Sequence, residues 1–265
     1  MRVNDVFRCI KRLSDNFIKK ENLLMDTKKV ALVTGANKGI GREIVRQLSE
    51  HGLRVYLGAR NEALGKQAAT ELSEGGSDVR FVRLDVTKSD SIQSCAQTIK
   101  DDSGKLDVLI NNAGVNFEAA PPSSANLDLI KKTFETNYFG AIATAQIMLP
   151  LLRNSEFRVI VNVSSELGSL GLHGVPEWPY ASFNFLAYNS SKTALNAFTV
   201  LLAKELRTEN FRVNSVNPGY TATELTQFRG TGTVQSAAAA IVKYALIGKD
   251  GPTGGFFTTG GSLPW

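Results

Sequence analysis

Tyr188 and Lys192 are the residue pair in this sequence with the clearest chemical use. They begin a segment, residues 188–202, whose apolar residues recur at helical spacing, so side chains four positions apart lie on one face. An unperturbed tyrosine has a pKa near 10 and is a poor acid at neutral pH. An ammonium within about 4–6 Å lowers the pKa of an acid by about 1–3 units. The pair therefore predicts a phenol that can donate a proton.

Polar side chains also close a neighbouring apolar run. Residues 157–165 predict a buried strand that ends in Ser164 and Ser165. Asn137 lies inside a long helical stretch, residues 127–152, where asparagine has poor helix propensity and usually needs a reason. Strand-end hydroxyls ahead of Tyr188 and Lys192 strengthen the case for acid catalysis. We expect Pro150, with Asn154 and Ser155, to end the 127–152 helix.

A glycine-rich turn follows the first apolar run, residues 30–33. Gly35 permits a tight turn, Gly39 lets the backbone approach a pyrophosphate, and Gly41 lets the next helix pack closely on the strand. The first N–H groups of that helix would point at the phosphates. The spacing G-x-x-x-G-x-G differs from the general dinucleotide pattern G-x-G-x-x-G, and a turn without a ligand is the alternative.

Strands alternate with helices along the rest of the chain. Strands are predicted at residues 30–33, 53–60, 79–86, 106–110, 157–165, 211–219 and 255–258, and helices after the glycine turn and at 61–74, 127–152, 188–202 and 237–246. This order predicts the α/β class. We expect one domain, residues 28–265, built on a doubly wound parallel sheet of about seven strands with helices on both faces and ligands at the strands' carboxyl ends.

Composition excludes several other classes. The 265 residues carry 43% hydrophobic and 21% charged residues, as in an ordinary globular chain. The net charge of +5 does not favour nucleic-acid binding, because six basic residues lie in the first twenty positions and the rest are scattered. Two cysteines form no disulfide framework and indicate a reducing, cytoplasmic location. No metal site is expected, because the two histidines have no partners at ligand spacing.

No run of apolar residues is long enough to span a membrane. Residues 1–24 place apolar side chains on one face of a possible helix and basic ones on the other, which would suit a membrane surface or a targeting segment. Three acidic residues and the lack of a small-residue cleavage site favour an N-terminal extension, residues 1–27, outside the chemistry.

The segment Thr34–Gly41 resembles the cofactor motif of the short-chain dehydrogenase/reductase family. Asn111-Asn112-Ala113-Gly114 after the fourth strand, Asn137-x-x-Gly140 and Tyr188-x-x-x-Lys192 also match that family's motifs. The resemblance covers about residues 28–265 and is strongest to the carbonyl-reductase-type members. Ala-Arg-Asn at 59–61 and Gly-Pro-Thr-Gly-Gly-Phe-Phe at 251–257 carry that finer likeness.

This resemblance implies reduction of an aldehyde, ketone or quinone by hydride transfer from NADPH. Tyr188 would donate the proton, Ser165 would orient the carbonyl oxygen, and Lys192 would lower the pKa of the tyrosine and hold the nicotinamide ribose. Asn137 would anchor a water beside the lysine. Ser165 is chosen over Ser164 because the family uses the second serine of such a pair, and a one-residue slip in register would reverse that choice.

The resemblance also implies the residues that bind NADP(H). Arg60 stands where NAD-dependent folds place an acidic residue, and with Lys38 it suits a 2′-phosphate. Asp85 would bond the adenine, although Asp85, Thr87 or Ser89 could each serve as a helix cap instead. The full implied set is Gly35, Asn37, Lys38, Gly39, Ile40, Gly41, Arg60, Asn61, Asp85, Val86, Asn112, Ala113, Gly114, Tyr188, Lys192, Pro218, Gly219, Thr221 and Thr223.

Two segments are candidates for contact with the substrate. Tyr188 follows Ser165 by 23 positions, about twice the usual family gap, and the added residues include Trp178, Tyr180, Phe183 and Phe185. They would wall the substrate pocket, cover the helix faces through which many members associate, or simply pack on the core. Residues 222–234, with two glycines, are expected to form a mobile lid. Whether the protein is a monomer or a homo-oligomer stays open.

Two rival functions remain open. One is a catalytically idle scaffold that binds NADPH, and the other is an NAD-dependent enzyme that oxidises alcohols. No stable membrane insertion and no nucleic-acid partner are expected, and the predicted partner is a small carbonyl compound.

Overall fold

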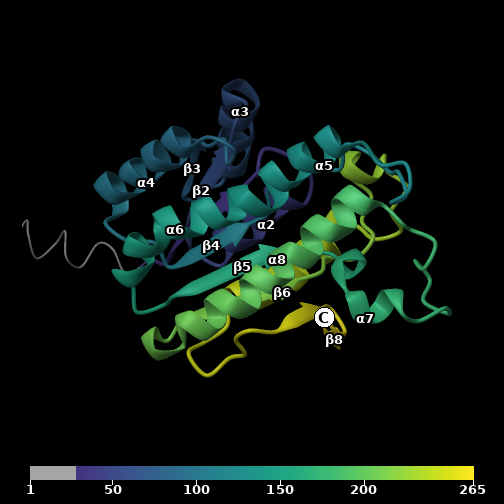
Figure 1. Ribbon diagram of the computed structural model, residues 1–265. Helices are drawn as coiled ribbons and strands as arrows, with labels where there is room; N and C mark the ends of the chain where they lie inside the picture. Colours follow the sequence, from purple (N-terminus) through teal and green to yellow (C-terminus); the bar gives the residue numbers. More distant parts are fainter. Residues whose placement is uncertain (1–27) are drawn as a thin grey trace, which may run out of the picture.

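The computed structural model describes residues 28–265, so the predicted extension over residues 1–27 lies outside the described residues. An eight-stranded sheet in the order β3-β2-β1-β4-β5-β6-β7-β8 runs through this part of the chain (Figure 1). Its strands are β1 (Val30–Thr34), β2 (Arg54–Ala59), β3 (Val79–Arg83), β4 (Val108–Asn111), β5 (Val159–Val163), β6 (Arg212–Val216), β7 (Phe256–Thr258) and β8 (Gly261–Ser262).

The seven predicted strands are confirmed, and all pair in parallel. Most are shorter than predicted, because the apolar runs continue into the loops at the strand ends. The eighth strand was missed. It pairs antiparallel with β7 through only Phe257 with Ser262 and Thr258 with Gly261, and two small residues leave no hydrophobic pattern to detect.

Two helical layers cover the sheet. One layer comprises α2 (Gly39–Glu50), α3 (Glu62–Ser73) and α9 (Val234–Ala245), and the other comprises α4 (Ser89–Ser103), α5 (Leu127–Phe134), α6 (Gly140–Arg153) and α8 (Leu186–Glu205). In Figure 1, α6 and α8 lie across the face of the sheet toward the viewer, and α2 lies behind it. Each layer encloses its own buried core, one containing Ile44 and Ile241, the other Met148 and Leu202. This arrangement confirms the doubly wound fold.

The long helix predicted at 127–152 is interrupted. Between α5 and α6, residues Glu135–Phe139 form a π-helical segment that contains Asn137. The prediction that Pro150 ends the helix is wrong, because α6 continues to Arg153 with the proline inside it. A proline removes one hydrogen bond and does not by itself end a helix when the flanking residues are packed on the core. The last helix also begins earlier than predicted, at Val234, where the Thr233 side chain caps it.

A buried chain of polar side chains ties α8 to the centre of the sheet. Asn111 donates from Nδ2 to Asn162 Oδ1 at 2.9 Å, and Asn162 donates from Nδ2 to Thr199 Oγ1 at 2.8 Å. The Thr199 hydroxyl also shares a 2.8 Å hydrogen bond with Ser215. These residues lie on β4, β5, α8 and β6, so this series of hydrogen bonds fixes α8 relative to the strand ends. The helix that carries Tyr188 and Lys192 is thereby held in place.

Replacing Asn162 by alanine should destabilise the fold. Asn162 is fully buried, and its loss would leave the amide of Asn111 and the hydroxyl of Thr199 each short of a partner, at about 1–3 kcal/mol for each unsatisfied group. Urea unfolding should show a clear fall in the free energy of unfolding. Asn184→Ala, at an exposed asparagine whose side chain makes no hydrogen bond within residues 28–265, is the matched control and should change it by less than about 0.5 kcal/mol.

Candidate active site

The glycine turn after β1 is a compact cradle of backbone. Gly35 and Gly39 have φ of +64° and +55°, a region that other residues rarely adopt. A Cβ at Gly41 would lie 2.5 Å from Asn112 Nδ2 and 2.6 Å from the Gly35 oxygen, so only glycine fits there. Asn112 donates from Nδ2 to the oxygens of Thr34 and Gly35 at 2.8 and 3.1 Å. The turn is therefore fixed against the loop after β4.

A cavity of about 660 Å³, called the cofactor-side cavity below, opens beside this turn. The predicted cofactor-binding residues that line it are Gly35, Asn37, Lys38, Gly39, Ile40, Gly41, Arg60, Asn61, Asp85, Val86, Asn112, Ala113, Gly114 and Thr223. They come from the carboxyl ends of β1, β2, β3 and β4 and from the loop after β6. The structure thus brings together residues that lie up to nearly 190 positions apart in the sequence.

Three cavity-lining residues that follow β2 and β3 make different contacts. Arg60 is exposed, and within residues 28–265 its guanidinium makes no ion pair. Asn61 caps α3, because its Oδ1 accepts from Leu64 N at 3.0 Å. Asp85 accepts from the backbone N and the hydroxyl of Thr87 at 3.0 and 2.8 Å. Despite its partial burial, these bonds and the nearby Arg60 charge hold the pKa of Asp85 below its usual value.

The alternative interpretation, that Asp85, Thr87 or Ser89 caps the following helix, is wrong. The N-cap of α4 is Lys88, which has an extended backbone and makes no capping side-chain bond. The Asp85 carboxylate is instead used within its own turn, and the backbone N of Asp85 donates to Ser91 Oγ at 2.9 Å.

Lys38 is already paired in this structure. Its ammonium forms an ion pair with Glu224, which lies 186 positions later on the loop after β6. Both side chains are more than half exposed, so the contact is a surface pair across the mouth of the cavity. Sequence analysis missed Glu224, because no pattern links a glycine turn to a residue so distant.

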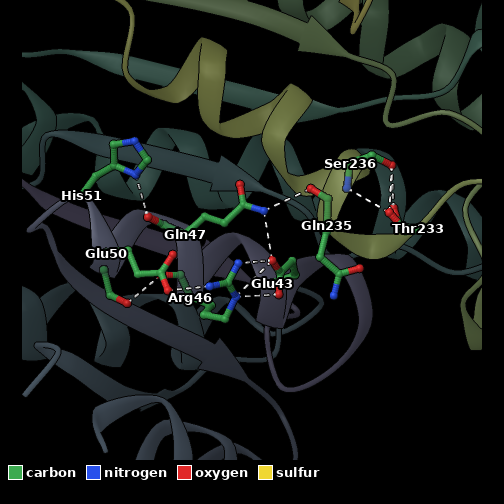
Figure 2. Close-up of polar contacts among 9 residues, drawn as sticks. Glu43, Arg46, Gln47, Glu50, His51, Thr233, Gln235 and Ser236 are labelled. Carbon is green, nitrogen blue, oxygen red and sulfur yellow. Dashed lines mark hydrogen bonds and ion pairs between the residues drawn. The ribbon is translucent and has the colours of Figure 1, made fainter. Parts of the chain in front are cut away.

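The loop that carries Glu224 is anchored at both ends. At its start, Ala222 N donates to Gly232 O at 2.9 Å and Gly232 N donates to Tyr220 O at 2.8 Å. At its end, the N-terminus of α9 is tied to α2, because Gln47 donates from Nε2 both to Gln235 O and to the Glu43 carboxylate, at 3.0 Å each (Figure 2). The two helices beside the cavity therefore hold the loop between them.

The two glycines of this loop serve close packing. A Cβ at Gly230 would lie 2.1 Å from the Thr221 carbonyl carbon, and one at Gly232 would lie 3.3 Å from Tyr220 O. The two glycines let the two ends of the loop come together. From the sequence, they were expected instead to make the loop a mobile lid. Thr226 closes the same loop, because its hydroxyl lies within 2.7 Å of Thr221 O and 3.0 Å of Thr223 O. Thr226 was not singled out from the sequence.

Tyr188 and Ser165 meet in a second cavity. Both line a space of about 280 Å³ beside the cofactor-side cavity, and the neighbouring Ser165 hydroxyl acts to lower the pKa of the Tyr188 phenol. Ser164 is buried, and its hydroxyl donates to Asn196 Oδ1 at 2.6 Å. The Ser164 hydroxyl is thus already used within the fold, and the choice of Ser165 as the functional serine stays a prediction.

The ionisation of Tyr188 differs from the sequence-based expectation. Burial raises the pKa of Tyr188 to about 12, and the neighbouring Ser165 hydroxyl opposes this shift only in part. The ammonium of Lys192 lies 5.7 Å from the centre of the tyrosine ring and donates to Val163 O at 2.8 Å. Burial also lowers the pKa of Lys192 to about 8. Desolvation of the two groups therefore outweighs their mutual effect in this structure.

Asn137 lies beside the lysine. Its Oδ1 accepts from Val115 N at 2.8 Å, and its Nδ2 donates to Val115 O at 2.9 Å and to Ser191 Oγ at 3.0 Å. A Cβ added at Gly114 would lie 3.5 Å from Asn137 Oδ1 and 3.6 Å from Lys192 Nζ, so these groups surround one small space. The π-helical segment explains why an asparagine occurs within a helix here, since such segments often mark functional sites.

The turn after β6 contributes to the second cavity. Pro218, Gly219 and Thr221 all line it. Thr221 is buried, and its hydroxyl contacts Gly219 O at 3.2 Å, so it also braces its own turn. Ile40, Thr223 and Leu225 line both cavities, which makes the two spaces neighbours.

The aromatic insertion walls this cavity. Tyr180, Phe183 and Phe185 line it together with Tyr220, and the ring centres of Tyr180 and Phe183 each lie 5.9 Å from that of Tyr220. The interpretation that the insertion walls a pocket is therefore the one that matches the contacts. Trp178 is buried behind the wall, and its ring centre lies 5.7 Å from that of Tyr180.

A model of the family described as short chain dehydrogenase matches residues 29–233. The chain belongs to the short-chain dehydrogenase/reductase family. It is a carbonyl-reductase-type member of this family of oxidoreductases.

Characterised relatives cover most of this dehydrogenase/reductase. It is 36% identical to (-)-isopiperitenone reductase from Mentha piperita, over 88% of this chain and 97% of that protein. It is 33% identical to salutaridine reductase from Papaver bracteatum, over 86% of this chain and 94% of that protein. The first alignment runs over 311 positions, more than the whole of this 265-residue chain, so that relative has many residues opposite gaps here.

Solved structures show the same fold. Salutaridine reductase from Papaver somniferum superposes with a TM-score of 0.75 at 31% identity, covering 88% of this chain and 100% of that one. The carbonyl reductase Sniffer of D. melanogaster gives a TM-score of 0.79 at 26% identity, with 90% and 100% covered. Within residues 28–265 of this family member, no helix combines the length and hydrophobicity that crossing a membrane requires.

The lowered pKa of Lys192 leads to a pH-dependent binding prediction for this dehydrogenase/reductase. If its ammonium holds the cofactor ribose, that contact is present below pH 8 and is lost as the pH rises through the pKa of about 8. Loss of a charge-assisted bond should raise the Kd for NADPH by about tenfold or more between pH 7 and pH 9.5. Fluorescence titration measures this change. Lys192→Met should bind weakly at both pH values, and an equal pH step in that variant would contradict the assignment.

Proposed function

We propose that this protein reduces the carbonyl group of an aldehyde, ketone or quinone to an alcohol, with NADPH as the hydride source. The observation that carries the proposal is the meeting of the Tyr188 phenol and the Ser165 hydroxyl in one cavity, next to a second cavity built around the glycine turn. The family and its named reductases supply the reaction class.

The cofactor-side cavity fits a dinucleotide with a 2′-phosphate. Gly35 and Gly39 adopt the conformations that expose backbone N–H groups, and any side chain at Gly41 would clash with the turn. Arg60 and Lys38 supply positive charge, while no acidic side chain stands at the end of β2. When bound, NADPH would supply the hydride that adds to the carbonyl carbon.

The residues around the second cavity would divide the remaining work. Ser165 would donate a hydrogen bond to the carbonyl oxygen, and Tyr188 would transfer its proton to that oxygen as negative charge develops. The phenol is protonated at neutral pH both at its ordinary pKa near 10 and at the raised value of about 12, so the donor form is the one present. Lys192 would hold the nicotinamide ribose, and Asn137 would anchor the water through which the proton is replaced.

The wall of the second cavity supports a bulky apolar substrate. Five aromatic side chains line it, Tyr188 among them, and the space of about 280 Å³ would hold a ring system better than a short aliphatic aldehyde. We propose a cytoplasmic location with this activity, because Cys95, the cysteine within the described residues, is a buried free thiol.

Turnover of a carbonyl panel tests the proposal. The full chain is incubated with NADPH and aldehydes, aryl ketones and quinones, and NADPH absorbance and the alcohol product are followed. We expect product and NADPH loss in equal amounts, fastest with bulky aryl substrates. Tight NADPH binding without turnover across the panel would favour an idle scaffold. Faster alcohol oxidation with NAD would favour the opposite direction of reaction.

A further inference from the structure

Glu166 is a charged residue in the substrate cavity that the proposed reduction does not use. It immediately follows Ser165, and its side chain lines the same cavity as Tyr188. Its two carboxylate oxygens accept from neutral donors, Asn217 Nδ2 and Trp178 Nε1, each at 3.2 Å. Within residues 28–265, no lysine, arginine or histidine forms an ion pair with it.

The surroundings hold this carboxylate in place without neutralising it. Trp178 lies on the aromatic insertion and Asn217 on the end of β6, so the two hydrogen bonds fix Glu166 between them. Its charge acts on the cavity, because it helps to raise the pKa of the Tyr180 phenol. A partly buried charge that neutral donors hold in place favours a ligand of opposite sign.

Aromatic rings lie beside the carboxylate. Tyr180, Phe183 and Tyr220 contact one another with ring centres 5.6–5.9 Å apart, and all three line the cavity. Aromatic ring faces attract cations, above all quaternary and tertiary ammonium groups. An aromatic wall next to an unneutralised carboxylate combines both sources of attraction.

We infer that the cavity accepts carbonyl substrates that carry a cationic amine, with the ammonium between Glu166 and the aromatic wall. This inference rests on the proposed function and names the substrate class for it. The cation would lie at the Glu166 side of the cavity while the carbonyl oxygen meets Ser165 and Tyr188. Arg229 also lines the cavity but is exposed on the loop after β6, so it lies toward solvent.

A matched pair of ketones tests the inference. 4-Acetylbenzyl(trimethyl)ammonium carries a permanent charge, and 4-neopentylacetophenone is its neutral isostere with the same insulating methylene. The ratio of their kcat/KM values cancels general effects of a variant. We expect the unmodified protein to prefer the cation by about tenfold, and Glu166→Gln to reduce that preference about tenfold.

Two further variants separate charge from structure. Glu166→Asp keeps the charge and should retain part of the preference. Glu156→Gln removes an exposed carboxylate just before the amino end of β5, whereas the cavity lies at the carboxyl ends of the strands. This variant should leave the ratio unchanged. An equal loss of preference in Glu166→Asp and Glu166→Gln would assign Glu166 a purely structural role and overturn the inference. No preference for the cation in the unmodified protein would also overturn it.

Calorimetry separates this inference from the proposed function. Benzyltrimethylammonium has no carbonyl, so its binding to the protein needs no turnover. We expect a measurable Kd that weakens about tenfold in Glu166→Gln and stays unchanged in Glu156→Gln. If the ion binds in this way and neither ketone is reduced, the reductase proposal fails and the cation site stands. If both ketones are reduced equally and the ion does not bind, the inference of a cation site fails and the reductase proposal stands.

Discussion

Tyr188→Phe should lower kcat for carbonyl reduction by about 10²–10⁴-fold, the range for losing a positioned general acid. The substitution removes one oxygen and keeps the ring, so the cavity should keep its shape. Tyr188 and Ser165 line the same cavity, so the Tyr188 hydroxyl is the acidic group placed where we propose that a carbonyl oxygen is held. Steady-state kinetics with a reactive aryl ketone measures the loss.

Binding and a matched variant make this result specific. NADPH affinity should change little in Tyr188→Phe, because the phosphates and adenine would lie in the other cavity. Tyr138→Phe changes a tyrosine that packs on Phe134 and Phe139 and should keep full activity. If Tyr188→Phe keeps more than about a tenth of the activity, Tyr188 is not the proton donor.

Arg60→Ala should weaken NADPH binding by about 10- to 100-fold and leave NADH binding nearly unchanged. Arg60 stands at the end of β2 on the cofactor-side cavity, and its guanidinium is free to meet a 2′-phosphate. NADH lacks that phosphate, so it loses nothing when the charge is removed. Titration of both cofactors by fluorescence gives the two Kd values.

A neighbouring arginine provides the control for this change in cofactor preference. Arg83→Ala removes an exposed arginine at the end of β3, which does not line either cavity, and should alter neither Kd. Equal losses for NADPH and NADH in Arg60→Ala would show that the residue supports the fold of the site and does not select the cofactor.

Much of the architecture could be predicted because it is encoded locally. Apolar runs such as 30–33 and 159–163 are buried strands, and glycines at 35, 39 and 41 occur where the backbone requires them. Ser164 and Ser165 meet different neighbours, Asn196 and Tyr188, because successive side chains of an extended backbone point in opposite directions, and the choice of Ser165 stays a prediction. Patterns of this kind need no knowledge of distant residues.

The remaining features depend on contacts between distant segments. The ion pair of Lys38 with Glu224 and the hydrogen bonds of Glu166 join parts of the chain that no local pattern connects. The pKa of Tyr188 was predicted to fall because spacing reveals a neighbouring lysine but not the burial of both groups. The π-helical segment at Asn137 was hidden because its residues continue the helical pattern of α5 and α6.

The anchoring of the loop after β6 limits how a cofactor can leave. Its base is fixed by Gly232, α9 beyond it is fixed to α2, and Thr226 braces the short turn Glu224–Thr226, so the Glu224 side chain is the part that can release Lys38. An exposed ion pair such as Lys38 with Glu224 contributes at most about 1 kcal/mol and weakens in salt. The ion pair can therefore open and re-form within each reaction cycle. Where departure of the oxidised nucleotide limits the overall rate, added salt should speed the enzyme up.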